Sequence, residues 1–239
     1  MMRSVTPITQ RELSAYFFSP IAYAMLAVFM LTLGVLFMVT TFQPGGDASI
    51  RNLAGTMPLV LAIFLPVLTM RLLADEFRSG TIETLMTAPV NESDVVLGKF
   101  LGAFLFYAVM LLGVLVFAFV VAAFGNLDGG VLLATFLGLL LLGGLYIAVG
   151  VFFSTCTSNQ IIAAVCTIVP LMVFTILIDR LAVRLDGLAA LVLHHLSINS
   201  HFSDFTRGLV DLNDVLFFAS TTGLFLFLAV KVLESRRWR

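Results

Sequence analysis

Six long apolar stretches constrain the fold of this chain more than any other feature. A helix needs about 20 apolar residues to cross the hydrocarbon core of a bilayer, because each residue adds about 1.5 Å. Such stretches recur along the 239 residues. They cover Pro20 to Phe42, Met57 to Leu73, Val96 to Phe124, Val131 to Phe153, Ile161 to Ile178 and Val215 to Leu233. We therefore predict an all-α integral membrane protein with about six transmembrane helices, in one transmembrane domain over residues 1–239.

The composition supports a chain that is surrounded by lipid. Hydrophobic residues make up 60% of the sequence and charged residues 11%, far from the near-half and one-quarter of soluble domains. The formal net charge of -1 offers no positive field for nucleic acid, so we predict no nucleic-acid partner. The second stretch is the weakest span because it is short and contains Pro58 and Pro66; we expect a kink near Pro66.

Residues 1–19 precede the first span and are predicted to form an interfacial amphipathic helix. Thr6-Pro7 resembles a helix start, and Ser19-Pro20 repeats this pattern at the first span. Apolar residues gather on one side of the helix, although Thr9 and Glu12 interrupt that side. The apolar residues are Val5, Ile8, Leu13 and Tyr16. A frayed tail is the alternative interpretation.

The distribution of Lys and Arg predicts the orientation, because these residues are retained on the cytoplasmic side. Nine of the thirteen lie on the side of the termini, and four, namely Arg51, Arg180, Arg184 and Arg207, lie on the other. Both termini are therefore predicted to be cytoplasmic. The loop over residues 74–95 then lies inside and the long loop over residues 179–214 outside. Leu188 to Leu196 is apolar but too short to span, which favours a re-entrant or interfacial helix.

The inner loop, residues 74–95, carries the most informative pattern. Gly80 permits a turn, Thr81 can cap a short helix and Pro89 ends it within about two turns. Glu83 would lie in the first turn of this helix, where its negative charge interacts favourably with the helix dipole. Ile82, Leu85 and Met86 form an apolar ridge, as expected for a helix that docks in a groove of another protein.

Asn91 and Asp94 can cap the following helix, where Gly98 and Gly102 predict close helix packing. The alternative is a loop whose caps simply end two spans.

Several activities lack their sequence signatures. No phosphate-binding loop, metalloprotease helix or nucleophile elbow occurs, so we predict a non-catalytic chain without a cofactor of its own. His194, His195 and His201 lie in the outer loop, where polar residues at a wet interface are the favoured interpretation over a metal site. Every Asp and Glu lies near a predicted span end. That disfavours a gradient-driven carrier, which usually buries such groups at mid-membrane depth.

The run from Glu76 to Lys99, with Ser79-Gly80-Thr81-Ile82-Glu83, Leu85, Pro89 and Val96-Leu97-Gly98-Lys99, resembles the coupling loop of ABC-2 type permeases, particularly the gliding-motility-type branch. The likeness extends to Arg11-Glu12-Leu13, to Phe17-Phe18-Ser19-Pro20, to His201-Phe202 with Phe205-Thr206-Arg207-Gly208, and to Leu233-Glu234-Ser235-Arg236-Arg237-Trp238. It covers nearly the whole chain. The pattern departs from the family at Asp75-Glu76, where a wider-spaced acidic pair is common.

The resemblance implies a type V exporter-like fold in a bacterial inner membrane. It also implies a second permease copy or paralogue, an ABC ATP-binding subunit that carries the ATP and Mg²⁺, and a companion membrane protein with a large periplasmic domain. We predict a permease that couples ATP hydrolysis to substrate movement. The alternative is a mechanotransmitter that drives a periplasmic partner without moving cargo. The predicted coupling residues are Glu76, Arg78, Gly80, Thr81, Ile82, Glu83, Leu85, Met86 and Pro89.

Overall fold

The computed structural model describes residues 5–41, 50–81, 91–124, 128–184 and 187–237, and these residues contain helices and turns but no strands. Within these ranges, six helices are long and apolar enough to cross a membrane, which confirms the predicted six-span, all-α fold. The candidate spans are Pro20–Thr40, Arg51–Ser79, Glu92–Ala123, Gly129–Cys156, Gln160–Ala182 and Leu212–Arg236.

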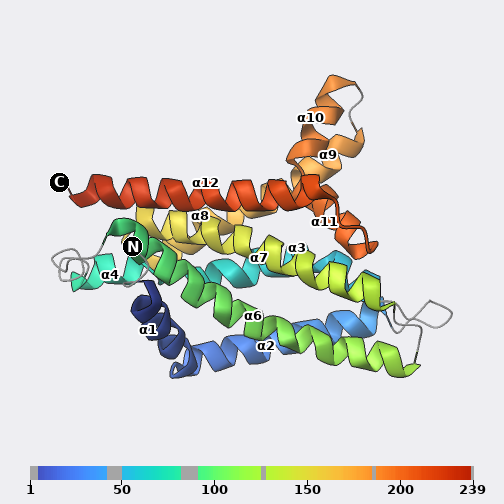
Figure 1. The fold of residues 1–239 in the computed structure, drawn as a ribbon, viewed down its shortest axis with the longest axis horizontal. Helices are drawn as coiled ribbons and strands as arrows, with labels where there is room; N and C mark the ends of the chain where they lie inside the picture. Colours follow the sequence, from blue (N-terminus) through green and yellow to red (C-terminus); the bar gives the residue numbers. More distant parts are fainter. Residues whose placement is uncertain (1–4, 42–49, 82–90, 125–127, 185–186, 238–239) are drawn as a thin grey trace.

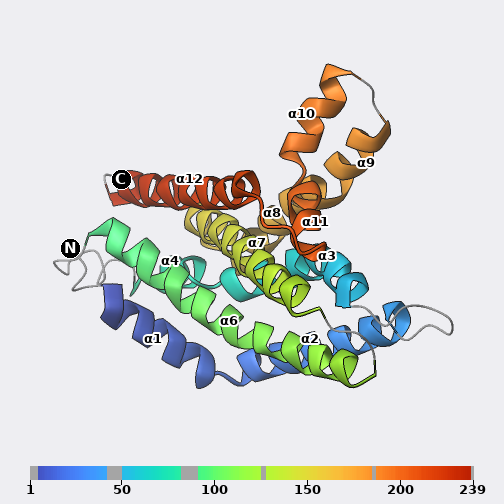
Figure 2. The same ribbon diagram turned by 45° about the vertical axis from the view of Figure 1, so that its right-hand side comes forward.

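The long helices run side by side in one bundle (Figures 1 and 2). They are α2 (Pro20–Thr40), α3 (Ile50–Thr69), α6 (Glu92–Phe124), α7 (Gly129–Cys156), α8 (Gln160–Met172) and α12 (Leu212–Arg237). The helix α1 (Val5–Phe17), the short α4 (Ala74–Ser79) and the C-terminal end of α12 lie at one end, which we call the termini end. The opposite end, where α9 (Ile178–Arg184), α10 (Leu188–Leu196) and α11 (Ile198–Thr206) lie, is called the hairpin end.

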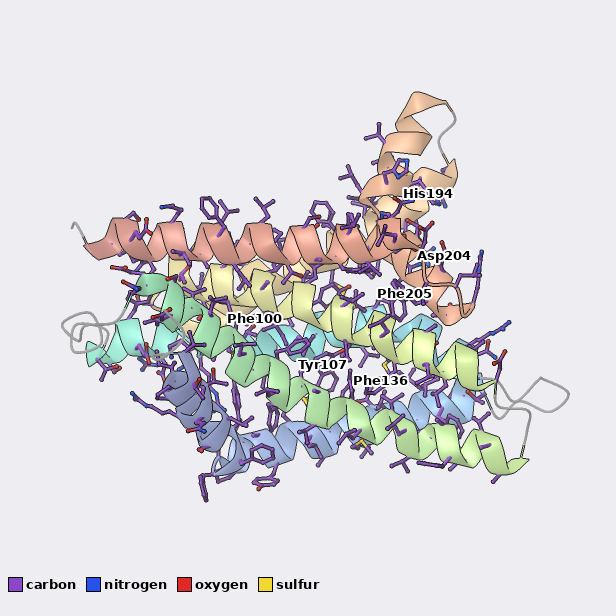
Figure 3. All side chains as sticks on the ribbon, viewed as in Figure 1. Phe100, Tyr107, Phe136, His194, Asp204 and Phe205 are labelled. Atoms are coloured by element: carbon purple, nitrogen blue, oxygen red, sulfur yellow. The ribbon has the colours of Figure 1, made fainter. Side chains whose placement is uncertain are left out.

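The helix α7 forms the centre of the bundle and packs against α3, α6, α8, α11 and α12. In the 18-residue apolar stretch of α7, 67% of the residues are buried, compared with 22% in that of α2 and 11% in that of α12. Large side chains such as Tyr107 and Phe205 fill the space around it, and Figure 3 shows both directed into the bundle. The outer faces of α2 and α12 are therefore left to lipid or to another chain.

The N-terminal helix packs along the first turns of α6. Its predicted apolar residues are buried or half-buried, whereas Gln10, Arg11 and Ser14 are exposed. The frayed-tail alternative is therefore wrong for residues 5–17, and the flat orientation in the membrane interface stays a prediction. The helix α2 starts after Ser19, with Pro20 at its first position as expected, although the Ser19 hydroxyl makes no capping hydrogen bond.

The second span differs from its predicted limits. The sequence placed residues 43–56 in a loop, but α3 already begins at Ile50. Leu53, Met57 and Leu61 follow one another at intervals of four and are fully buried. Packing of this helical face therefore stabilises helix on the N-terminal side of the predicted span start at Met57. At the other end α3 stops at Thr69, and a turn over residues 70–73 leads into α4.

The described part of the long predicted outer loop contains three helices. The apolar run Leu188–Leu196 is helical, as expected, and α9 and α10 pack against each other and project away from the bundle past α12 (Figure 1). The element that turns back into the bundle is α11, which buries Ile198, Phe202 and Phe205. Between α8 and α9 lies a π-helical segment, η1 (Val173–Leu177), shortly after Pro170.

Candidate functional site

A buried lysine joins three helices at the termini end. Lys99, in the second turn of α6, is 2% exposed, and its Nζ lies 2.8 Å from Glu12 Oε1 of α1 and 2.8 Å from Glu76 Oε1 of α4. Both bonds are charge-assisted and therefore stronger than neutral ones. Glu76 Oε2 is buried and finds no hydrogen-bond partner among the described residues. We call Glu12, Glu76 and Lys99 the charged node.

Two glycines let α1 approach α6 closely enough to form this node. A Cβ at Gly98 would lie 2.7 Å from Ile8 Cγ2, and a Cβ at Gly102 would lie 2.7 Å from Glu12 Cβ. The hydroxyl of Thr9 donates to the Gly98 carbonyl at 3.3 Å. Thr9 and Glu12, the two residues that interrupt the apolar side of α1, are thus the ones that bond to α6. The predicted close packing at Gly98 and Gly102 involves α1.

A buried tyrosine attaches the last turn of α1 to the end of α3. The Tyr16 hydroxyl donates to the Leu68 carbonyl at 3.0 Å, and the guanidinium of Arg71 lies 5.0 Å from the centre of the Tyr16 ring. Burial raises the pKa of Tyr16, because an uncompensated phenolate is costly away from water. Tyr16 therefore remains a neutral hydrogen-bond donor.

A serine of α7 occupies the break between α3 and α4. The Ser154 Oγ accepts from the backbone N–H groups of Leu73 and Ala74, each at 3.0 Å, and donates to the Met70 carbonyl at 3.2 Å. These are backbone groups that the end of one helix and the start of the next leave without intrahelical partners. Ser154 is fully buried, so these three contacts connect α7 directly to α4.

The helix α4 also contacts α8 and α12 through its side chains. Asp75 Oδ1 accepts from Gln160 Nε2 at 2.7 Å, which gives a role to the acidic position where the sequence departs from the resembled family. The Arg236 guanidinium lies 4.5 Å from the centre of the Phe77 ring and donates to the Cys156 carbonyl. Over its six residues, α4 is therefore linked directly to α6, α7, α8 and α12, and through Lys99 to α1.

A polar cavity of about 310 Å³ opens between α1 and α4. It is lined by three basic side chains, Arg11, Arg71 and Lys99, and by three acidic ones. The acidic ones are Glu12, Asp75 and Glu76. Because the charges balance, the cavity has no strong preference for an anion or a cation.

Residues 74–81 and 91–95 of the predicted coupling loop lie within the described residues. Glu76 belongs to the charged node, Arg78 is exposed in the last turn of α4, and Gly80 has a φ of 72° that ends this helix. Thr81 is exposed beside Ser79, with 2.9 Å between the hydroxyl oxygens. Ile82, Glu83, Leu85, Met86 and Pro89 lie outside the described residues. The role of the loop in coupling stays a prediction.

Sequence reasoning missed the charged node and Ser154. It used Lys99 for the orientation and both Lys99 and Glu12 for the family resemblance, but it gave neither side chain a partner. The available signal was the position of Lys99 within the apolar run that starts at Val96, since a charge there needs a partner. Ser154 gave no such signal, because a serine at a span end is common.

The three histidines at the hairpin end do not converge on one point. His201 Nδ1 lies 2.6 Å from Asp214 Oδ1 and its Nε2 lies 3.1 Å from the His195 carbonyl oxygen, while the rings of His194 and His195 are exposed. Within the described ranges, no group of three His, Cys, Asp or Glu side chains could hold a metal ion.

Within the described residues, six long apolar helices and a polar assembly around the short helix α4 define a multi-pass helical membrane protein. A family model described as "ABC-2 family transporter protein" matches residues 13–236, and the chain belongs to this family. No curated protein matches the sequence. Membership identifies the chain as a permease subunit of an ABC transporter and implies an ATP-binding ABC subunit as its partner. Permeases of this family are typically non-catalytic membrane subunits. The narrower resemblance to the gliding-motility branch stays a prediction.

Proposed function

We propose that this permease couples ATP hydrolysis by its partner subunit to the movement of a substrate across the bacterial inner membrane. The observation that carries the proposal is α4, which directly precedes the predicted docking segment, contacts four other helices and is bridged to α1 by Lys99. ATP and Mg²⁺ belong to the partner in this proposal, because the sequence has no phosphate-binding loop.

The contacts of α4 suggest how motion would spread. Gly80 ends α4, so a displacement of residues 81–87 by the ATPase reaches α4 first. From there the charged node carries it to α1 and α6, while Ser154 carries it to α7. Buried polar contacts are costly to break because their groups would be left unpaired, so the helices that they join move together. The spans would thus respond together.

The assembly around the chain belongs to the same proposal. The termini end lies in the cytoplasm, and the hairpin end faces the periplasm. The largely unburied helix α2 leaves room for a second permease copy or a paralogue, and the projecting α9 and α10 offer a surface to a companion protein with a periplasmic domain.

Two substitutions in the coupling loop test the proposal. Leu85→Ala removes an apolar anchor, which usually costs about 2 kcal/mol at an interface, so the recovery of the ATPase in pull-downs should fall roughly tenfold near the midpoint of binding. Glu83→Ala should leave association within about threefold and mainly reduce the stimulation of ATP hydrolysis. If the Leu85→Ala complex assembles with wild-type affinity and hydrolyses ATP at the coupled rate, this segment does not dock the ATPase.

Labelling of single cysteines tests the orientation. In a background that lacks Cys156 and Cys166, Asn213→Cys at the hairpin end should react with an impermeant thiol reagent in intact cells. Ser79→Cys at the termini end should react only after the membrane is permeabilised. Both positions are exposed, so accessibility to solvent does not explain a difference. The reverse pattern would place the coupling loop on the side without ATP.

A further inference from the structure

An apolar cavity of about 330 Å³ lies between α7, α8 and α12, and Leu196 and Ile198 line it at the hairpin end. Among its twelve described lining side chains, Thr221 is the one polar residue. Leu145, Val149 and Leu171 form a buried floor, whereas Phe174 and Leu224 at its edge are 40% and 54% exposed. The cavity therefore opens sideways, out of the bundle, and its size lies within the range of about 300 to 1,000 Å³ that is typical of ligand sites.

A second, polar cavity of about 660 Å³ adjoins the apolar one at the hairpin end. Phe217 lines both cavities, and its ring stacks on His201 with 4.1 Å between the ring centres. Figure 3 shows two further residues of the polar cavity, His194 on α10 and Asp204 on α11, at this end of the bundle. One site thus combines an apolar part at membrane depth with a polar part at the membrane surface.

Carboxylates dominate the charge of the polar cavity. Asp204, Asp211 and Asp214 line it. Asp214 is 5% exposed and contacts His201 through Oδ1, while its Oδ2 is buried and has no partner in the described part of the chain. Asp204 lies 3.9 Å from the guanidinium of Arg207, and Asp211 has no cationic partner among the described residues. Such a cavity attracts a cationic group and repels a phosphate or a sulfate.

We propose that these two cavities bind one amphiphile with an alkyl chain and an ammonium head group, taken from the membrane leaflet at the hairpin end. The alkyl chain of the ligand enters the apolar cavity from the side, because the edge formed by Phe174 and Leu224 opens towards the surrounding lipid. The ammonium group lies near Asp211. A soluble cation would leave the apolar cavity empty, and an anionic lipid would place its head group against three carboxylates. The inference deepens the proposed function by naming a ligand class. It rests on the proposed function only where it assigns the hairpin end to the periplasmic side of the membrane.

The test uses the full-length chain in nanodiscs, without the ATPase, so that its result is independent of ATP coupling. A photoactivatable alkylammonium and an alkyl sulfate with the same chain are compared. We expect the ammonium probe to label peptides of α8 and α12, and excess unlabelled alkylammonium to compete. Leu224→Trp should reduce this labelling about tenfold, because the larger side chain takes space from the alkyl chain of the probe. Losing the burial of about two CH₂ groups of the probe accounts for such a factor. Leu31→Trp, at a 68% exposed position of α2, is the control and should leave labelling unchanged.

A second pair of variants tests the head group. Asp211 Oδ1 accepts from the backbone N–H of Asn213 at the start of α12, and an asparagine keeps this acceptor while it removes the charge. Asp211→Asn should weaken binding of the ammonium probe about threefold to fivefold. Asp128 makes the corresponding contact with Gly130 at the start of α7, so Asp128→Asn is the matched control and should have no effect.

Three results would overturn the proposal. The first is equal labelling by the sulfate probe, because the polar cavity would then not select charge. The second is undiminished labelling of Leu224→Trp. The third is efficient photo-crosslinking between two copies from a benzoylphenylalanine at position 224, because a second copy would then cover the cavity.

Discussion

The charged node gives a quantitative prediction, because the chain contains a matched exposed pair. Lys99 and Lys231 each hold a glutamate at 2.8 Å or less. The Lys99 side chain is 3% exposed, whereas the Lys231 side chain is 53% exposed and its partner Glu234 is 39% exposed. Replacement of either lysine by methionine keeps the length of the side chain and removes the charge. The two variants therefore differ mainly in the burial of the carboxylates that lose their partner.

The Lys99→Met change leaves Glu12 and Glu76 close together without a counter-charge. Breaking a buried ion pair by removing one partner costs about 3 to 5 kcal/mol. Here both carboxylates keep some access to solvent, at 16% and 17% of the side chain, so we expect a loss of about 2 to 3 kcal/mol. At about 2 to 4 °C per kcal/mol, the Tm should fall by about 4 to 12 °C. Lys231→Met should cost about 0.5 kcal/mol or less.

Thermal unfolding of the purified chain in nanodiscs, followed by the helical circular dichroism signal, measures both variants. Glu76→Gln in the Lys99→Met background should restore part of the lost stability, because it removes one of the two unpaired carboxylates. This partial rescue distinguishes the charge from the packing of the lysine stem. If Lys99→Met lowers the Tm no more than Lys231→Met, the node does not join α1, α4 and α6 energetically.

Two further substitutions test the other contacts at the termini end. Ser154→Ala removes the partner of three buried backbone groups and should cost about 1 to 3 kcal/mol in the same assay, whereas Ser220→Ala on the exposed side of α12 should change the Tm by less than about 1 °C. Gly98→Ala forces α1 away from α6, so a disulfide engineered between these helices should form more slowly. Gly144→Ala, where the nearest atom lies 3.5 Å away, should leave that rate unchanged.

The sequence alone determined the number and type of the membrane-spanning helices. Lipid cannot satisfy backbone hydrogen-bonding groups, so every long apolar stretch had to become a spanning helix. Local chemistry also fixed the start of α2 at Ser19-Pro20 and the end of α4 at Gly80, because the covalent geometry of these residues acts without any distant partner. Neither conclusion needed a neighbouring helix.

Contacts between distant segments decided the rest. The extension of α3 back to Ile50, the return of α11 into the bundle and the role of Ser154 all depend on packing against other helices. Lys99 illustrates the difference most clearly: its charge was visible in the sequence, but its partners lie 87 and 23 residues away along the chain. A buried charge requires compensation, and only the tertiary structure determines which carboxylates provide it.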